Sequence, residues 1–95
     1  MEYLEKIGFT SEDISIIKKS NSKVIYNLLQ EQKRVVQANI LYLKKLNIKN
    51  YKDIFVKYAD LFLTDNSNFI EIFNKYDQED LVIKLDNNID IFPYL

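Results

Sequence analysis

The sequence predicts an all-α protein of short stacked helices, arranged in one small solenoid-like bundle. Apolar residues recur at three- and four-residue spacing along most of the chain, which is the period of a helix buried on one face. Hydroxyl, Asp and Asn residues stand just ahead of these runs, where they cap helix starts. Only one Gly and one Pro interrupt the chain, and 95 residues suffice for one hydrophobic core. We therefore expect a single domain over residues 1–95.

The first third of the chain predicts three short helices separated by capping residues. Gly8 ends the first helix, because glycine adopts a positive φ at low cost. Thr10 stands three residues before an acid, as in a capping box, and starts a helix over residues 11–19. Ser22 caps a third helix over residues 23–30. The positions expected to face inward are Ile14, Ile16, Ile17, Val24, Ile25, Leu28 and Leu29.

Residues 33–46 are the most regular amphipathic stretch and predict the central helix. Val36, Ile40 and Leu43 share one stripe, and apolar neighbours widen it to nearly half of the circumference. Asn39 lies in the middle of this apolar arc. Because buried polar groups are normally satisfied, we expect its amide to hydrogen-bond to a neighbouring helix.

Three more helices are placed by their caps, and an apolar tail follows them. Asn50 and Asp65 precede apolar runs and predict helix starts, and Asp77 predicts the start of a last helix over residues 78–86. Pro93 prevents an ordinary helix from continuing through the tail, so we expect an irregular segment there.

A repeated unit becomes visible when the caps are aligned. The segment Leu4–Phe9 recurs as Leu43–Ile48, with Gly8 and Asn47 at the helix-ending position. An acid and an apolar residue then open the next helix. The unit is a helical pair plus a short helix, present about two and a half times by the alignment of caps. The copies span residues 4–42, 43–76 and 77–95.

This unit resembles the repeat of the mitochondrial transcription termination factors. That repeat runs leucine, two residues, leucine, glycine and an apolar residue, followed by a polar cap, an acid and an apolar residue. The segment from Leu4 to Leu43 carries the match best. The resemblance implies a curved solenoid of stacked units. It also implies nucleic-acid binding through basic residues on the concave face.

The tail is too apolar to stay in solvent. A truncated last repeat leaves an apolar face open, and the ends of a solenoid need a cap. We expect the tail to fold back over the last helix and the face that carries Phe69 and Phe73. The alternative is that this end stays open and pairs with a second copy of the chain.

The residues present argue against an enzyme. The chain has no Cys and no His, which excludes thiolate nucleophiles, the usual zinc sites and the commonest general base. The acid pairs Glu12–Asp13 and Glu79–Asp80 occupy first turns of helices, where the backbone dipole favours carboxylates. Residues 86–90 alternate oxygen side chains, but they lack the glycine and glutamate of a calcium loop. We predict no catalytic activity, no cofactor and no metal.

The start of the chain lacks the apolar core of a signal peptide, and no apolar run approaches the length of a membrane span. We therefore expect a cytoplasmic protein with no membrane partner.

The leading functional prediction is an interaction module that binds a protein partner or itself. Thirteen Phe and Tyr residues exceed what a core of this size readily covers. Some of them should form an exposed apolar patch of the kind that marks partner surfaces. The candidate partner contacts are Leu41, Ile91, Phe92, Tyr94 and Leu95.

The alternative is a nucleic-acid-binding repeat protein that uses the basic first two-thirds of the chain. Residues 1–59 hold eleven Lys or Arg and six Asp or Glu, a charge of +5, whereas residues 60–95 hold two and eight, a charge of −6. An overall pI near 5.4 ranks this alternative second. The candidate phosphate contacts are Lys18, Lys19, Lys23, Lys33, Arg34, Lys44 and Lys45, with Tyr26, Tyr42 and Tyr51 as candidates for stacking on bases.

Overall fold

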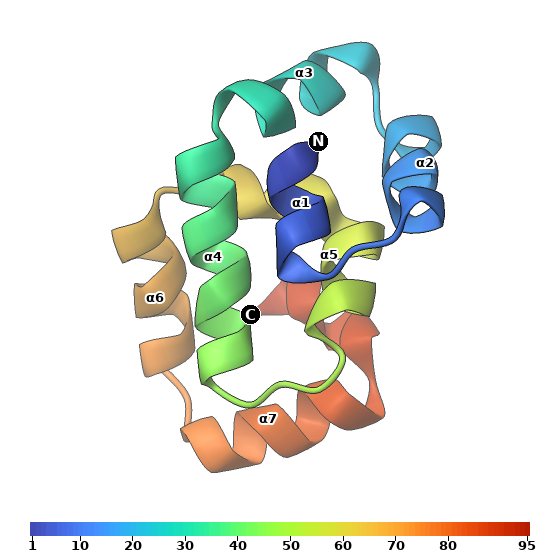
Figure 1. The fold of residues 1–95 in the computed structure, drawn as a ribbon. Coiled ribbons are helices and arrows are strands. Elements are labelled where there is room, and N and C mark those ends of the chain that lie inside the picture. Colours follow the sequence, from blue (N-terminus) through green and yellow to red (C-terminus); the bar gives the residue numbers. More distant parts are fainter.

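The computed structural model describes residues 1–95 and contains helices and no strand, as the sequence predicts (Figure 1). The α-helices are α1 (Glu2–Ile7), α2 (Ser11–Ser20), α3 (Lys23–Glu31), α4 (Lys33–Lys45), α5 (Tyr51–Tyr58), α6 (Asn66–Asn74) and α7 (Gln78–Asn87), and the 3-10 helices are η1 (Ala59–Leu63) and η2 (Ile89–Tyr94). Two α-helices followed by a short 3-10 helix occur twice in this order, as α4, α5, η1 and as α6, α7, η2.

Helices α1 and α4 end in the same backbone motif. Gly8 has a φ of 112° and Asn47 a φ of 66°, both in the left-handed region. The next residues, Phe9 and Ile48, donate their N–H groups to the carbonyl five residues earlier, at 3.0 and 3.2 Å, and both are buried. This is the Schellman arrangement, in which a residue with positive φ satisfies the last carbonyls of a helix. The predicted equivalence of the two segments is confirmed at this position.

Side-chain caps start three of the α-helices. The Thr10 hydroxyl accepts the N–H of Asp13 at 3.1 Å, and the Asp13 carboxylate accepts the N–H of Thr10 at 2.9 Å, which completes the predicted capping box of α2. Ser22 caps α3 and Asp77 caps α7 in the same way, each accepting an N–H three residues on. These contacts are local, which is why the sequence reveals them.

Asn50 and Asp65 start helices as predicted, but their side chains do not make the predicted cap hydrogen bonds. Asn50 starts α5, but its side chain donates to the carbonyl of Asp86 in α7 at 2.9 Å and makes no cap bond. Asp65 starts α6, but its carboxylate accepts the hydroxyl of Ser67 and makes no cap bond to the backbone. A tertiary contact replaces the cap bond of Asn50, whereas a local side-chain contact two residues on replaces that of Asp65.

The hydrophobic core forms around α4. Val36, Ile40 and Leu43 are fully buried, as their spacing predicts, and α4 packs on α1, α3, α5, α6 and η1. Asn39 is also fully buried, and its amide donates to the carbonyls of Phe62 (2.9 Å) and Thr64 (2.7 Å). The predicted core amide is therefore confirmed.

Two residues expected inside lie outside. Ile16 is 48% exposed and Val24 is 68% exposed. Helices α2 and α3 lie at the edge of the molecule, where each buries a single residue, Ile17 or Leu29 (Figure 1). Ile14 and Ile25 are half-buried against the core, whereas Ile16 and Val24 face outward because no element covers that side.

The tail folds back onto the body, and Phe92 enters the core. Its ring lies 6.2 Å from the ring of Phe69, 6.1 Å from Phe73 and 5.5 Å from Phe62, and η2 also packs on α7 and α5. The predicted docking on the Phe69 and Phe73 face is confirmed. The expected irregular segment is instead a 3-10 helix that includes Pro93.

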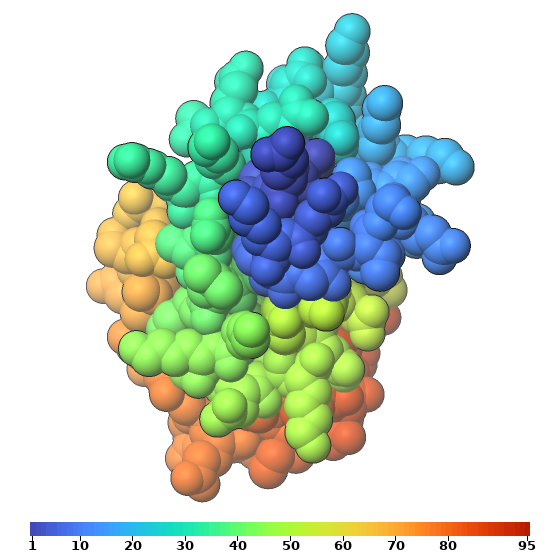
Figure 2. Space-filling view, in the orientation of Figure 1, coloured from blue at the N-terminus to red at the C-terminus, as the bar shows by residue number.

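All of the helices contribute buried residues to one core. The radius of gyration is 12.7 Å, close to the value of about 13 Å for a compact 100-residue domain, and the extents are 35 × 24 × 23 Å. Helix α1 covers the middle of the face in Figure 2, between α4 and α2. The arrangement is thus a closed globule and not an open curved array. No helix has both the length and the apolar character to cross a membrane.

Candidate functional site

An apolar hollow of about 90 Å³ opens beside the tail, between η1, α6 and η2. We call it the tail groove. The rings of Phe69, Phe73 and Phe92 are buried and form its floor, whereas Ile72 and Leu95 are half-buried. Its lining residues are Leu61, Thr64, Phe69, Ile72, Phe73, Phe92, Pro93 and Leu95.

The structure exposes some of the candidate partner contacts and buries others. Tyr94 is 86% exposed, and Ile91 and Leu95 are half-buried. Phe92 is only 7% exposed, so it is a core residue rather than a free surface contact. Leu41 is 41% exposed on α4, and it lines none of the hollows. Of these residues, the structure brings Phe92 and Leu95 together in the tail groove.

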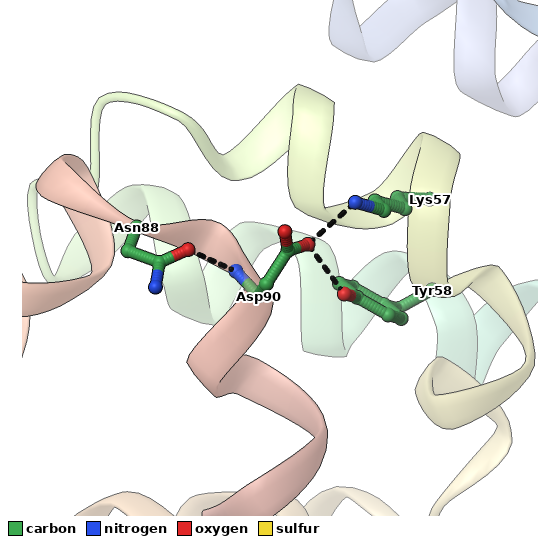
Figure 3. Close-up of polar contacts among 4 residues, drawn as sticks. All are labelled: Lys57, Tyr58, Asn88 and Asp90. Atoms are coloured by element: carbon green, nitrogen blue, oxygen red, sulfur yellow. Dashed lines mark hydrogen bonds and ion pairs between the residues drawn. The ribbon is translucent and has the colours of Figure 1, made fainter.

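A polar clip holds η2 against the end of α5. One carboxylate oxygen of Asp90 accepts from the Lys57 ammonium and from the Tyr58 hydroxyl, each at 2.6 Å (Figure 3). The side-chain oxygen of Asn88 accepts the N–H of Asp90 at 3.1 Å. Because η2 supplies Phe92 to the groove, the clip also positions the groove floor.

The clip lowers the pKa of its carboxylate and raises the pKa values of its ammonium and hydroxyl groups. Hydrogen bonds from Lys57 and Tyr58 lower the pKa of Asp90 below its usual 3.8. The hydrogen bond to Asp90 raises the pKa of Lys57 above 10.5 and the pKa of Tyr58 above 10.0. Lys57 and Asp90 are each 53% exposed, so solvent screens the pair. None of the three residues lines a hollow, and we interpret the cluster as structural.

The acidic residues at 86–90 are engaged by protein donors. Asp86 accepts the N–H of Lys49 at 3.0 Å, and Asp90 belongs to the clip. The Asp86 contact ties the end of α7 to the α4–α5 connection, and the Asp90 contacts tie η2 to α5. The structure gathers no group of three side chains suited to hold a metal ion.

The candidate phosphate contacts fall into separate groups. Lys18, Lys19 and Lys23 surround the α2–α3 turn, and a hollow there is lined by Lys18, Lys23, Tyr26 and Asn27. The Lys18 ammonium lies 5.9 Å from the centre of the Tyr26 ring. We call Lys18, Lys19 and Lys23 the basic patch. None of them forms an ion pair, because the chain's two ion pairs are Lys57–Asp90 and Lys84–Asp80.

The remaining basic candidates lie at the two ends of α4. Lys33 and Arg34 begin the helix, and Lys44 and Lys45 end it. Eleven residues of helical rise separate these pairs by about 16 Å. At this separation, the two pairs do not form one basic surface.

The aromatic candidates for base stacking differ in their surroundings. Tyr42 packs edge-on against Phe69, with centroids 6.4 Å apart, and lies 5.7 Å from Phe73, so it belongs to the core boundary. Tyr26 and Tyr51 are half-buried and lie near lysines 18 and 52. Tyr42 is also half-buried, but it alone of the three packs against core Phe rings.

No protein-family model, curated protein or solved structure matches this chain. The resemblance to the termination-factor repeat is therefore a proposal that depends on the repeated residues of the chain itself.

Proposed function

We propose that this chain is a protein-binding helical module whose tail groove takes an apolar side chain of its partner. The observation that carries the proposal is the open apolar hollow of about 90 Å³ over the rings of Phe69, Phe73 and Phe92. A cavity of about 150 Å³ accommodates a benzene ring, so the smaller groove suits one aliphatic side chain. Burial of such a side chain contributes about 1.5–3 kcal/mol to binding. Contacts with residues around the groove must supply the remaining binding free energy.

The charge around the groove and the exposed aromatic residue beside it indicate the chemistry of the partner. The elements that line the groove, η1, α6 and η2, come almost entirely from the part of the chain with charge −6. Tyr94 beside the groove is 86% exposed and offers an aromatic contact. The partner that fits is a protein segment with an aliphatic residue flanked by Lys or Arg, because complementary charge steers association and sets specificity.

A peptide titration tests the proposal. The isotopically labelled chain is titrated with a short Lys-flanked peptide that has a central Leu, and with a matched peptide that has Ser in its place. We expect the amide signals of Ile72 and Leu95 to shift with the Leu peptide and to stay with the Ser peptide. Identical shifts with both peptides, or none at millimolar peptide, contradict the proposal.

The same experiment is run with duplex DNA. We expect no binding in the micromolar range. Binding that weakens steeply as salt rises, with shifts at Lys18, Lys19 and Lys23, would instead support the nucleic-acid alternative, because phosphate contacts release counterions.

A further inference from the structure

We infer that the partner in the tail groove is a second copy of this chain, which inserts Val24, the residue that follows Lys23 of its basic patch. This inference rests on the proposed function, since it names the occupant of the same groove. Three observations carry it: an uncovered aliphatic side chain, the charges on either side of the contact, and the positions of the two surfaces on the molecule.

Val24 is the most exposed aliphatic side chain of the chain, at 68%. It stands in the first turn of α3, next to Lys23, where the molecule offers nothing to cover it. The valine side chain is small enough for a hollow of about 90 Å³ that is lined mainly by apolar residues. The groove lacks an apolar occupant, and Val24 lacks an apolar cover.

The charges of the two surfaces are complementary. The basic patch around Val24 has three lysines without an ion-pair partner. The groove is built from the acidic part of the chain, where Asp60 and Glu71 are exposed and form no ion pair. Two grooves facing each other would oppose like charges, so the charges favour contact between unlike surfaces.

The two surfaces lie on different sides of the fold. Helices α2 and α3 occupy the right and upper edges of Figure 1, whereas α6 occupies the left edge. Side chains of α2 and α3 project outward from these edges in Figure 2. One molecule therefore cannot fill its own groove with Val24. Each copy would insert its Val24 into one neighbour and receive the Val24 of another, which is a heterologous contact.

Two other exposed aliphatic residues fit the tail groove less well than Val24 by the same criteria of exposure and charge. Ile83 is 61% exposed but lies on α7 in the acidic part, where it would meet a like-charged groove. Leu41 is flanked by lysines 44 and 45 but is only 41% exposed. Both provide comparison variants for the test.

Light scattering after size exclusion measures the association. At low salt we expect the wild-type mass to rise above 11.4 kDa with protein concentration and to return toward it at high salt. Val24→Asp places a charge in the contact, and Asp is well tolerated in the first turn of a helix. Leu95→Lys places a cation at the groove. We expect each variant to be monomeric, and the matched control Ile83→Asp to associate as the wild type does.

Mixing the two variants gives the decisive result. Val24→Asp keeps an intact groove and Leu95→Lys keeps an intact Val24, so an equimolar mixture should form a species of two copies and nothing larger. Association that survives both substitutions, or that is lost through Leu41→Asp or Ile83→Asp instead, overturns the inference. A monomeric wild type that binds the Leu peptide overturns self-association alone. A chain that does neither overturns the proposed function as well.

Discussion

Asn39 shows at the scale of one residue how this small core is specified. It is the single fully buried polar side chain, and it joins α4 to the η1–α6 connection. Its amide donates to two carbonyls, and its oxygen accepts from Asn66 at 2.9 Å. No buried side-chain nitrogen or oxygen lacks a partner. One amide therefore sets the path of the chain between two elements that sequence periodicity does not connect.

Asn39→Ala should lower the free energy of unfolding by about 2–4 kcal/mol, because it leaves the carbonyls of Phe62 and Thr64 without their donor. Urea denaturation followed by circular dichroism measures the loss. The control Asn27→Ala, at an exposed site of α3, should change it by no more than about 0.5 kcal/mol. Equal values for the two variants would show that the buried amide is not important for stability.

At the scale of the element, α4 lies at the centre of the core and η2 closes the aromatic cluster beside the groove. Helix α4 buries one stripe and leaves Leu41 outside it. Helix η2 brings Phe92 among the rings of Tyr58, Phe62, Phe69 and Phe73 and is fastened by the Asp90 clip. Each of the two elements has a separate test.

The faces of α4 predict a contrast among three neighbouring positions. Ile40→Ala and Leu43→Ala should each cost about 2–5 kcal/mol, since both side chains are fully buried. Leu41→Ala, at a 41% exposed position, should cost well under half as much. Denaturation midpoints at a common slope give the comparison. Equal losses at all three positions would contradict the assigned face.

Removal of residues 91–95 tests the docking of η2. The deletion takes Phe92 out of the aromatic cluster, and we expect a loss of at least about 3–5 kcal/mol, the usual cost of a buried Phe. The control Tyr94→Ala, at an 86% exposed site, should have little effect. An unchanged denaturation midpoint after the deletion would mean that the tail contributes nothing to the fold.

At the scale of the whole molecule, charge separates one part of the chain from the other. Residues 1–59 carry +5 and residues 60–95 carry −6, and only two ion pairs form. Most of these charges are therefore free to act on a partner or on a second copy. The Lys57–Asp90 pair is the one that joins the two parts. Its titration should therefore change the free energy of unfolding.

The stability contribution of the clip should depend on pH at both ends of the scale. The pKa of Asp90 is lowered in the fold, so its contribution is present above about 3.8 and is lost as the pH falls through the lower folded value. The pKa values of Lys57 and Tyr58 are raised, so their contribution is present below about 10 and is lost as the pH rises through the folded values.

The measurement compares the wild type with Asp90→Asn. We expect the difference between their urea midpoints to be largest near neutral pH and to shrink in acid and in strong base. The control Asp60→Asn removes a carboxylate with no hydrogen bond or ion pair, and its midpoint difference should not follow this profile. A constant difference for Asp90→Asn across the range would show that the clip does not form in solution.

The sequence by itself determined the helices, most of their ends and the buried stripe of α4. Gly8, Asn47 and Thr10 act on backbone groups within five residues, so local spacing is enough to identify them. The docking of the tail also followed from composition, because apolar residues after a helix stop need a cover.

Only the tertiary structure decided which apolar side chains are covered and which polar groups pair at a distance. Asn50 meets Asp86 across 36 positions of the chain, and the tail groove combines residues from Leu61 to Leu95. Val24 has the spacing of a buried residue and is exposed. The physical reason is that periodicity shows which side of a helix is apolar, whereas burial depends on whether another element packs against that side.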